Sequence, residues 1–342
     1  MSRSRKTATQ GFEDRTHQKD AGRFTIGVVG LGLMGTSIAT CLLAAGHPVV
    51  SVDRDPSKRS RARRRILAYL NEMRAEGLVK GDPRRRLFYF TVAKEYAALA
   101  GSQLVVEAIV EDLKAKRECL GQIERYVSRD TVIGSNTSAI PPSLLQQGSE
   151  YPDRILGVHW AEPAHTTRFM EIICGNRTDE KFAERARKLA QGWGKEPSVL
   201  RRDIRGFITN RCMYALMREA FHLVEAGYAT IEDVDRSIRN DFGYWITFAG
   251  PFRFMDLTGI PAYAAVMRDL FPELNCSKEV PDLMRQMVDS GAQGVSNAKG
   301  FYRYSPAQAR RWEKLFMRFS YEIRALAEKY PADAGDRRRQ RR

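Results

Sequence analysis

The sequence has no hydrophobic run long enough to cross a membrane, and it has no secretory signal. None of its apolar stretches approaches the roughly 20 residues that span a bilayer, and residues 1–22 lack the apolar core of a signal peptide. This stretch is basic, but Glu13, Asp14 and Asp20 argue against a transit peptide. We therefore interpret residues 1–22 as a disordered basic leader and expect a cytoplasmic protein without a membrane partner.

Cysteine is scarce, and its spacing argues against the usual sites that cysteines build. The five cysteines make an odd total and include no CxxC pair. That pattern is not typical of a disulfide framework or of a zinc site. We predict no metal site, and we expect Cys41, Cys119, Cys174, Cys212 and Cys276 to be small buried hydrophobic residues in a reducing compartment.

Acidic residues are outnumbered by basic ones, and the formal net charge is +15. The leader contributes +2, and residues 331–342, which we interpret as a basic tail, contribute +3, so +10 lies on residues 23–330. A basic body favours polyanionic ligands such as nucleotide cofactors, coenzyme A or nucleic acid. Because no aromatic platform is interleaved with the basic residues and no nucleic-acid-binding module appears, we predict no nucleic-acid partner.

A strand, a glycine turn and a helix are present over residues 23–47. The GxGxxG spacing uses Gly30 for a tight turn, Gly32 for close approach of a pyrophosphate, and Gly35 for packing of helix on strand. The helix N-terminus then directs its unpaired amides at the phosphates. This pattern predicts a dinucleotide-binding unit.

Asp53 closes the second strand, where an acidic side chain binds both ribose hydroxyls and favours NAD over NADP, although Arg54 beside it weakens that preference. Residues 56–77 form a strongly basic amphipathic helix. We interpret this helix either as a phosphate-binding arm for coenzyme A or as a solvated basic face, and the sequence does not choose between the two.

Polar residues follow the next two predicted strands. Glu107 and Glu111 come at the carboxyl end of one strand, and Ser138 lies in the polar turn that follows the other. Ligands of open α/β sheets bind at this edge. Lys116 falls on the intervening helix.

The segment 157–173 contains one histidine and one glutamate, each inside a short apolar run. The runs read as two brief strands joined by a polar turn. Pairing of these strands would bring His159 and Glu171 together, and a carboxylate on one ring nitrogen raises the basicity of the other. The pair is interpreted as a general base, with a structural histidine and a salt-bridging glutamate as the alternative.

The chain changes character near Arg205. Before it, strands and helices alternate; after it, successive amphipathic helices follow without further strands. We therefore predict an α/β fold, a Rossmann-type, doubly wound and mostly parallel sheet in residues 23–205, followed by an all-α domain in residues 206–330.

Taken together, these motifs resemble the 3-hydroxyacyl-CoA dehydrogenase family over about residues 23–305. The matching segments, in order, are GLGLMG, Asp53, VVEAIVEDLKAK, SNTSAI, GVHW with EII, GFITNR, GPFRFMDLTG and GFYRY. The resemblance implies NAD as cofactor and a homodimer formed through the helical domain. It also implies the following NAD-binding residues: Gly30, Gly32, Leu33, Met34, Gly35, Asp53, Glu111 and Lys116.

The resemblance assigns catalytic roles as well. His159 is expected to take the proton of the 3-hydroxyl as hydride passes to NAD, and Glu171 to orient the resulting imidazolium. Ser138 is expected to hydrogen-bond the substrate oxygen, and Asn210 to help hold the carbonyl. The implied reaction is the reversible oxidation of a small 3-hydroxyacyl-CoA in fatty acid metabolism.

Some positions depart from the family pattern. Glu162 stands where the family has an asparagine, and Ser296 stands where it has a lysine before the closing GFY. The helical arm after Gly81 is short, so residues that bind coenzyme A cannot be transferred. The long spacing in GYWITFAGPF is similar to the carnitine and gulonate dehydrogenases, which oxidise free 3-hydroxy acids, and this is the alternative function.

Two other interpretations are less favoured. The 6-phosphogluconate-like dehydrogenases share GLGLMG, but this sequence lacks their glycine-rich substrate loop and helix-borne lysine. A structural role is known for crystallins of the same superfamily, but the complete set of Ser138, His159, Glu171 and Asn210 favours catalysis.

Overall fold

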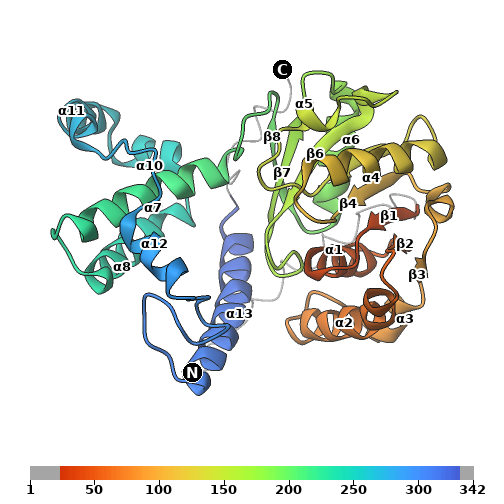
Figure 1. The fold of residues 1–342 in the computed structure, drawn as a ribbon, viewed down its shortest axis with the longest axis horizontal. Coiled ribbons are helices and arrows are strands. Elements are labelled where there is room, and N and C mark those ends of the chain that lie inside the picture. The colour runs from red at the N-terminus through yellow and green to blue at the C-terminus, as the bar shows by residue number, and fades with distance from the viewer. Residues whose placement is uncertain (1–23, 332–342) are drawn as a thin grey trace, which may run out of the picture.

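The computed structural model describes residues 24–331, and its first part is one eight-stranded sheet (Figure 1). The strand order is β3-β2-β1-β4-β5-β6-β7-β8, and every neighbouring pair is parallel except β6 and β7. The order reverses between β1 and β4, which makes a topological switch point at that edge. The predicted doubly wound, mostly parallel sheet is confirmed. Its strands are β1 (Ile26–Val29), β2 (Val49–Val52), β3 (Phe90–Ala93), β4 (Leu104–Glu107), β5 (Val132–Ser135), β6 (Ile155–Trp160), β7 (Phe169–Cys174) and β8 (Glu196–Leu200).

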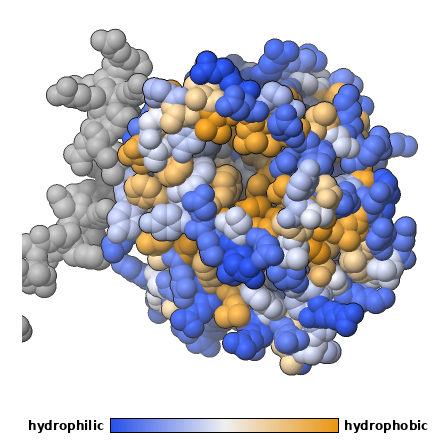
Figure 2. Space-filling view, turned by 90° about the vertical axis from the view of Figure 1, so that its left-hand side faces the viewer, coloured by the Kyte–Doolittle hydropathy of each residue, from blue (hydrophilic) through white to orange (hydrophobic). Residues whose placement is uncertain are grey.

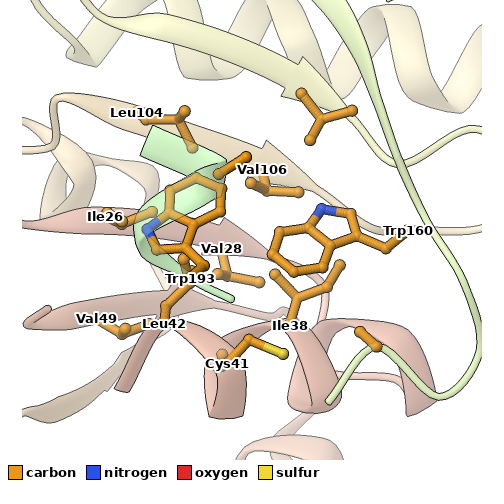
Figure 3. Close-up of a cluster of buried hydrophobic side chains, with 14 of the residues drawn as sticks. Ile26, Val28, Ile38, Cys41, Leu42, Val49, Leu104, Val106, Trp160 and Trp193 are labelled. Carbon is orange, nitrogen blue, oxygen red and sulfur yellow. The ribbon is translucent and has the colours of Figure 1, made fainter. Parts of the chain in front are cut away.

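Helices cover both faces of the sheet because the strands are apolar on both sides. On one face pack α1 (Leu33–Ala44), α2 (Pro56–Ala75) and α6 (Glu180–Gly192), and Figure 3 shows part of this layer, where Trp160 and Trp193 lie among Val28, Ile38 and Val106. On the other face pack α4 (Leu113–Tyr126), α5 (Pro142–Leu145) and the 3-10 turn η1 (Tyr96–Leu99). Two further short elements complete this part, α3 (Pro83–Leu87) and η2 (Pro152–Arg154).

The basic helix α2 forms as the sequence predicts. The Asp55 side chain accepts a hydrogen bond from the Ser57 amide, and Pro56 occupies the first turn, where its missing N–H costs nothing. Ile66 and Leu70, one turn apart, are fully buried against the sheet. The arginines of α2 lie mainly on its solvent side.

The remainder of the described chain is helical, as predicted. Beyond β8, residues 201–331 contain only isolated bridges, at Gly294–Lys299 and Lys299–Arg303, and no strand. Because β8 ends at Leu200 and the next helix begins at Thr209, we place the domain boundary near Arg205. The helices are α7 (Thr209–Glu225), α8 (Ile231–Asn240), α9 (Phe242–Ile246), α10 (Gly250–Thr258), α11 (Ile260–Leu270), α12 (Asp282–Asp289) and α13 (Pro306–Lys329), with a 3-10 turn η3 (Phe271–Glu273).

The helical part buries little of its apolar surface within one chain. Among residues 209–331 only Val234, Ala309 and Tyr321 are buried. Two cysteines follow the same pattern: Cys212 and Cys276 are exposed, so the expectation that all five are buried is wrong for these two. They lie in a region that forms no closed core of its own.

The last helix lies in Figure 1 between α7–α12 and the sheet-containing part, on the side of α1. Arg324 of α13 contacts the Thr166 and Gly194 carbonyls, so α13 packs on the sheet-containing part of the chain. The predicted leader, residues 1–22, and the tail after Pro331 lie outside the described residues. Among residues 24–331, no helix combines the length and low polarity that crossing a bilayer requires.

Candidate active site

His159 and Glu171 meet directly on the β6–β7 hairpin. The antiparallel register pairs them across the two strands, which points both side chains to the same face of the sheet. His159 Nδ1 lies 2.9 Å from Glu171 Oε2, and both residues are buried. Because Nδ1 donates to the carboxylate, Nε2 is the ring nitrogen that can accept a proton.

The carboxylate of Glu171 is also held from the helical part of the chain. Its Oε1 accepts the backbone N–H groups of Ile208 and Thr209, at 3.1 and 3.0 Å, where α7 begins. Burial raises the pKa of Glu171, but the hydrogen bonds from His159 and from the two amides outweigh burial, and the net pKa is lowered. Glu171 is therefore an anion at neutral pH, as an orienting partner of an imidazole must be.

Two aromatic rings form the walls around the imidazole. Phe169 lies edge-on to His159 with ring centroids 5.3 Å apart, and the Phe207 ring is 5.7 Å away. Phe207 has φ of +54°, in the left-handed region that non-glycine residues rarely occupy, yet it is buried. Sequence reasoning missed both rings. The only local signal for Phe207 is its place in GFITNR, just before a helix.

Ser138 and Asn210 are brought together by the Asn210 side chain and the Ser138 backbone, while the Ser138 hydroxyl takes no part in the contact. The Asn210 side-chain amide donates to the Ser138 carbonyl at 2.9 Å, which ties α7 to the turn after β5. The Ser138 amide donates to Glu111 Oε1 at 2.9 Å, and the Thr137 hydroxyl donates to the same oxygen. Ser138 as a whole is exposed. The catalytic roles of Ser138 and Asn210 stay predictions.

Lys116 lies beneath this turn in a buried ion pair. Its ammonium is 2.8 Å from Glu107 Oε1 and 3.2 Å from Glu111 Oε2, and the side chain is fully buried. Glu107, fully buried as well, also accepts the Ile109 amide at 2.7 Å and the Ser135 hydroxyl at 2.5 Å. Lys116 thus links the carboxyl ends of β4 and β5 indirectly, through the two glutamates that accept from Ser135 and from the turn after β5. Its proposed contact with the cofactor stays a prediction.

A cavity of about 480 Å³ opens at the glycine turn, at the carboxyl edge of β1 and β2. Five of the eight predicted cofactor residues line it, and Gly35, Glu111 and Lys116 do not; the five are Gly30, Gly32, Leu33, Met34 and Asp53. None of the four predicted catalytic residues lines this cavity. His159 lies farther along the same edge, on β6.

The glycines of the turn have different surroundings. A Cβ on Gly35 would lie 1.8 Å from the Gly30 carbonyl oxygen, so this position must be glycine for helix and turn to pack. A Cβ on Gly32 would meet nothing within 4 Å, because its open side faces the cavity. This free space beside the first amides of α1 fits a pyrophosphate.

Asp53 lies at the far end of the cavity with both carboxylate oxygens already engaged. Oδ2 accepts the Leu31 amide at 2.7 Å, and Oδ1 accepts the Asp55 amide at 2.8 Å. These bonds fix the carboxylate at the end of β2, where it can accept from a ribose diol with its remaining lone pairs. Arg54 and Lys58 line the same cavity.

Comparison with models of protein families identifies the family of this chain. The model of the 3-hydroxyacyl-CoA dehydrogenase NAD-binding domain matches residues 25–204, and the model of the C-terminal domain of the same enzymes matches residues 206–304. The chain belongs to the 3-hydroxyacyl-CoA dehydrogenase family. It therefore has an NAD-binding domain, and the prediction of NAD as cofactor is confirmed. The residues around the glycine turn fit that cofactor.

Known members of the family are similar over most of the chain. A 5-formyl-3-hydroxy-2-methylpyridine 4-carboxylate 5-dehydrogenase of Mesorhizobium japonicum is 30% identical, covering 89% of this chain and 98% of the relative. A 3-hydroxybutyryl-CoA dehydrogenase of Mycobacterium tuberculosis is 32% identical, covering 82% and 98%. An L-carnitine dehydrogenase of Oceanobacillus iheyensis is also 32% identical, covering 79% and 88%.

A solved structure confirms the fold over nearly its whole length. It is a 5-formyl-3-hydroxy-2-methylpyridine 4-carboxylic acid 5-dehydrogenase, described as an NAD⁺-dependent dismutase. The TM-score is 0.83 with 29% sequence identity, and the match covers 90% of this chain and 99% of that one. The coarse function, an oxidoreductase of the 3-hydroxyacyl-CoA dehydrogenase family, follows from this and the family models.

Proposed function

We propose that this protein oxidises a CH–OH carbon of a small substrate, with His159 as the general base. The observation that carries the proposal is the 2.9 Å contact between His159 Nδ1 and Glu171. Glu171 holds the ring with Nδ1 protonated, so Nε2 takes the hydroxyl proton, and the carboxylate stabilises the imidazolium that forms. NAD, when bound, supplies the hydride acceptor.

The surrounding residues support this chemistry. Phe169 and Phe207 limit the access of water to the imidazole, which strengthens its electrostatic interaction with Glu171. Ser138 is exposed in the turn that Asn210 bridges to α7, and we propose that its hydroxyl donates to the substrate oxygen. We further propose that Asn210 acts by holding this turn against the helical domain.

The leading substrate class is a small 3-hydroxyacyl-CoA. The exposed arginines of α2 and α3 support it, because they form a basic surface suited to the phosphates of coenzyme A. The alternative is a free 3-hydroxy acid, as in the carnitine and gulonate dehydrogenases. This alternative is supported by the similarity, over 89–90% of this chain, to a pyridine carboxylate dehydrogenase. The name of that enzyme does not mention coenzyme A. A hydrated aldehyde, like an alcohol, has a carbon that carries both a hydrogen and a hydroxyl. The same base can therefore take the hydroxyl proton from an alcohol or from a hydrated aldehyde.

Steady-state rates will separate the two classes. With NAD or NADH in excess, kcat/KM is to be measured for acetoacetyl-CoA and 3-hydroxybutyryl-CoA, and for free 3-hydroxybutyrate, carnitine and a pyridine aldehyde. A thioester enzyme is expected to prefer the CoA esters by more than about a hundredfold, because it uses the binding energy of the carrier. A smaller preference would exclude the first class and favour the free acid. Turnover of none of them would contradict the proposal.

We also propose that the protein is a homodimer formed through its helical part. α7 to α12 contain only one buried residue, Val234, and Figure 2 shows hydrophobic residues gathered around a hollow on this side of the molecule. Phe252 on α10 is 80% exposed and Leu257 is 62% exposed, as a face covered by a second copy would be.

Sedimentation equilibrium is expected to give twice the chain mass of 38.9 kDa. Phe252→Glu is expected to shift the protein to the monomer, because a charge in an apolar interface leaves a carboxylate buried without a partner. Phe88→Glu is the matched control, since Phe88 is 83% exposed but lies on the sheet-containing part. A monomeric wild type, or equal effects of the two variants, would contradict the dimer.

A further inference from the structure

Residues 161–168 form the turn that joins the two strands of the proposed catalytic pair. The turn begins two residues after His159 and ends at Arg168, just before Phe169, whose ring lies against the imidazole. Its exposed member Glu162 stands three positions from His159. The turn therefore leads directly into Phe169 at the start of β7 and carries the charged side chain of Glu162.

A buried lysine from another part of the chain binds the inside of this turn. Lys195, between α6 and β8, is 5% exposed. Its ammonium donates to the Ala164 carbonyl at 2.5 Å and also to the Thr167 carbonyl, and it lies over the Trp160 ring at 5.1 Å. Two carbonyls of one turn thus converge on one cation. A buried ammonium requires such partners, so the turn cannot move away without leaving the charge unpaired.

The last helix closes over this lysine. Arg324 of α13, with its side chain 9% exposed, reaches the Thr166 carbonyl at 3.5 Å and the Gly194 carbonyl at 3.4 Å. α13 begins at Pro306, beyond the last residue matched by the family's C-terminal domain model. A segment outside that domain therefore contributes to holding the turn.

The turn itself contains a buried histidine, His165, which is not part of the proposed catalytic pair and which fixes the turn to α1 and α2. His165 is fully buried, its Nδ1 is 2.8 Å from the Ser37 hydroxyl of α1, and its ring stacks on Tyr69 of α2 at 4.1 Å. Burial, with Lys195 and Arg324 nearby, lowers its pKa to about 4, so the ring is neutral at pH 7. His165 thus packs beside Lys195 without adding a second charge.

We propose that Lys195 is a positioning residue for the substrate side of the site: it holds the turn 161–168 so that Phe169 and Glu162 meet the substrate. This inference rests on the proposed function of His159. Lys195 touches neither His159 nor Glu171. The catalytic pair is held separately, by the β6–β7 register and by the α7 amides on Glu171. Loss of Lys195 therefore affects substrate binding more than the proton transfer.

The test compares Lys195→Met with Arg154→Met. Arg154 is an equally buried cation that donates to backbone carbonyls, those of Ser128 and Glu124, away from the turn. Lys195→Met is expected to raise KM about tenfold or more with kcat changed less than about threefold, because a misplaced turn weakens substrate contacts. Arg154→Met is expected to lower the Tm and leave KM unchanged. The substrate is acetoacetyl-CoA or free 3-hydroxybutyrate, whichever the wild type turns over faster.

Hydrogen–deuterium exchange of residues 161–168 gives a second readout that does not need activity. Exchange is expected to be faster in Lys195→Met and unchanged in Arg154→Met. Lys195→Gln retains two N–H donors and is expected to restore part of the wild-type KM. If Lys195→Met fails to fold, Lys195→Gln and Arg324→Met take its place, and wild-type KM and exchange in both would overturn the proposal. Equal kinetic changes in Lys195→Met and Arg154→Met would overturn it as well.

The two proposals fail in different ways. If His159 is not the base, His159→Gln retains turnover, whatever Lys195 does. If Lys195 is only a structural residue, His159→Gln loses turnover while Lys195→Met keeps the KM and the exchange of the turn at wild-type values.

Discussion

Replacing His159 with glutamine is expected to lower kcat by about 10²- to 10⁴-fold, the contribution typical of a general base. Among residues 24–331 the imidazole is the only basic side chain paired with Glu171, and glutamine retains a polar side chain of similar size without a group that accepts the proton. The cofactor cavity does not include His159, so the Kd for NAD is expected to stay within about twofold of wild type. Stopped-flow hydride transfer and fluorescence titration with NADH measure the two quantities.

A matched control separates the loss of a base from the loss of a buried ring. His47 is also a buried histidine; it lies against Phe24 and Trp193, in the loop between α1 and β2, which carries none of the predicted catalytic residues. His47→Gln is expected to lower stability without lowering kcat. If His159→Gln keeps wild-type kcat, or if both variants lose activity to the same extent, the assignment of His159 as base is wrong.

Replacing Lys116 with methionine is expected to destabilise the protein by about 3–5 kcal/mol, the cost of leaving one member of a buried ion pair without its partner. The remaining carboxylate of Glu107 is fully buried at the end of β4. The Ile109 amide and the Ser135 hydroxyl still donate to it, but neither carries a charge. Urea denaturation at pH 7 measures the change in the free energy of unfolding.

Two further variants identify the cause of this destabilisation. Lys114→Met removes an exposed lysine two residues earlier on the same helix and is expected to change stability by less than about 0.5 kcal/mol. Adding Glu107→Gln to Lys116→Met is expected to recover part of the loss, because the unpaired charge is then gone. A small effect of Lys116→Met alone would mean that the pair contributes little, and the absence of any recovery would mean that packing is the cause.

The same variant also tests the cofactor role predicted for Lys116. If the lysine acts only by joining the ends of β4 and β5, NAD affinity of the folded variant stays near the wild-type value. A large rise in the Kd for NAD would instead support a contact of Lys116 or Glu111 with the cofactor.

Much of the fold was predictable because its signals are local. The apolar β-branched runs predict the parallel strands, Pro56 suits the first turn of α2, and the spacing of Gly30, Gly32 and Gly35 predicts the turn between β1 and α1. The pairing of His159 with Glu171 was also predictable from a local signal. They are twelve positions apart on one hairpin, so the strand register alone brings them together.

The sequence by itself thus determined the individual strands, the glycine turn and the pairing of His159 with Glu171, since each depends on residues close together along the chain. Only the tertiary structure decided what surrounds them. Phe207 reaches His159 through a left-handed turn, and Lys195 and Arg324 reach the hairpin turn from 28 and 158 positions away. A buried cation is paired with whichever carbonyls the packing of distant elements brings near it, and no local pattern specifies that partner.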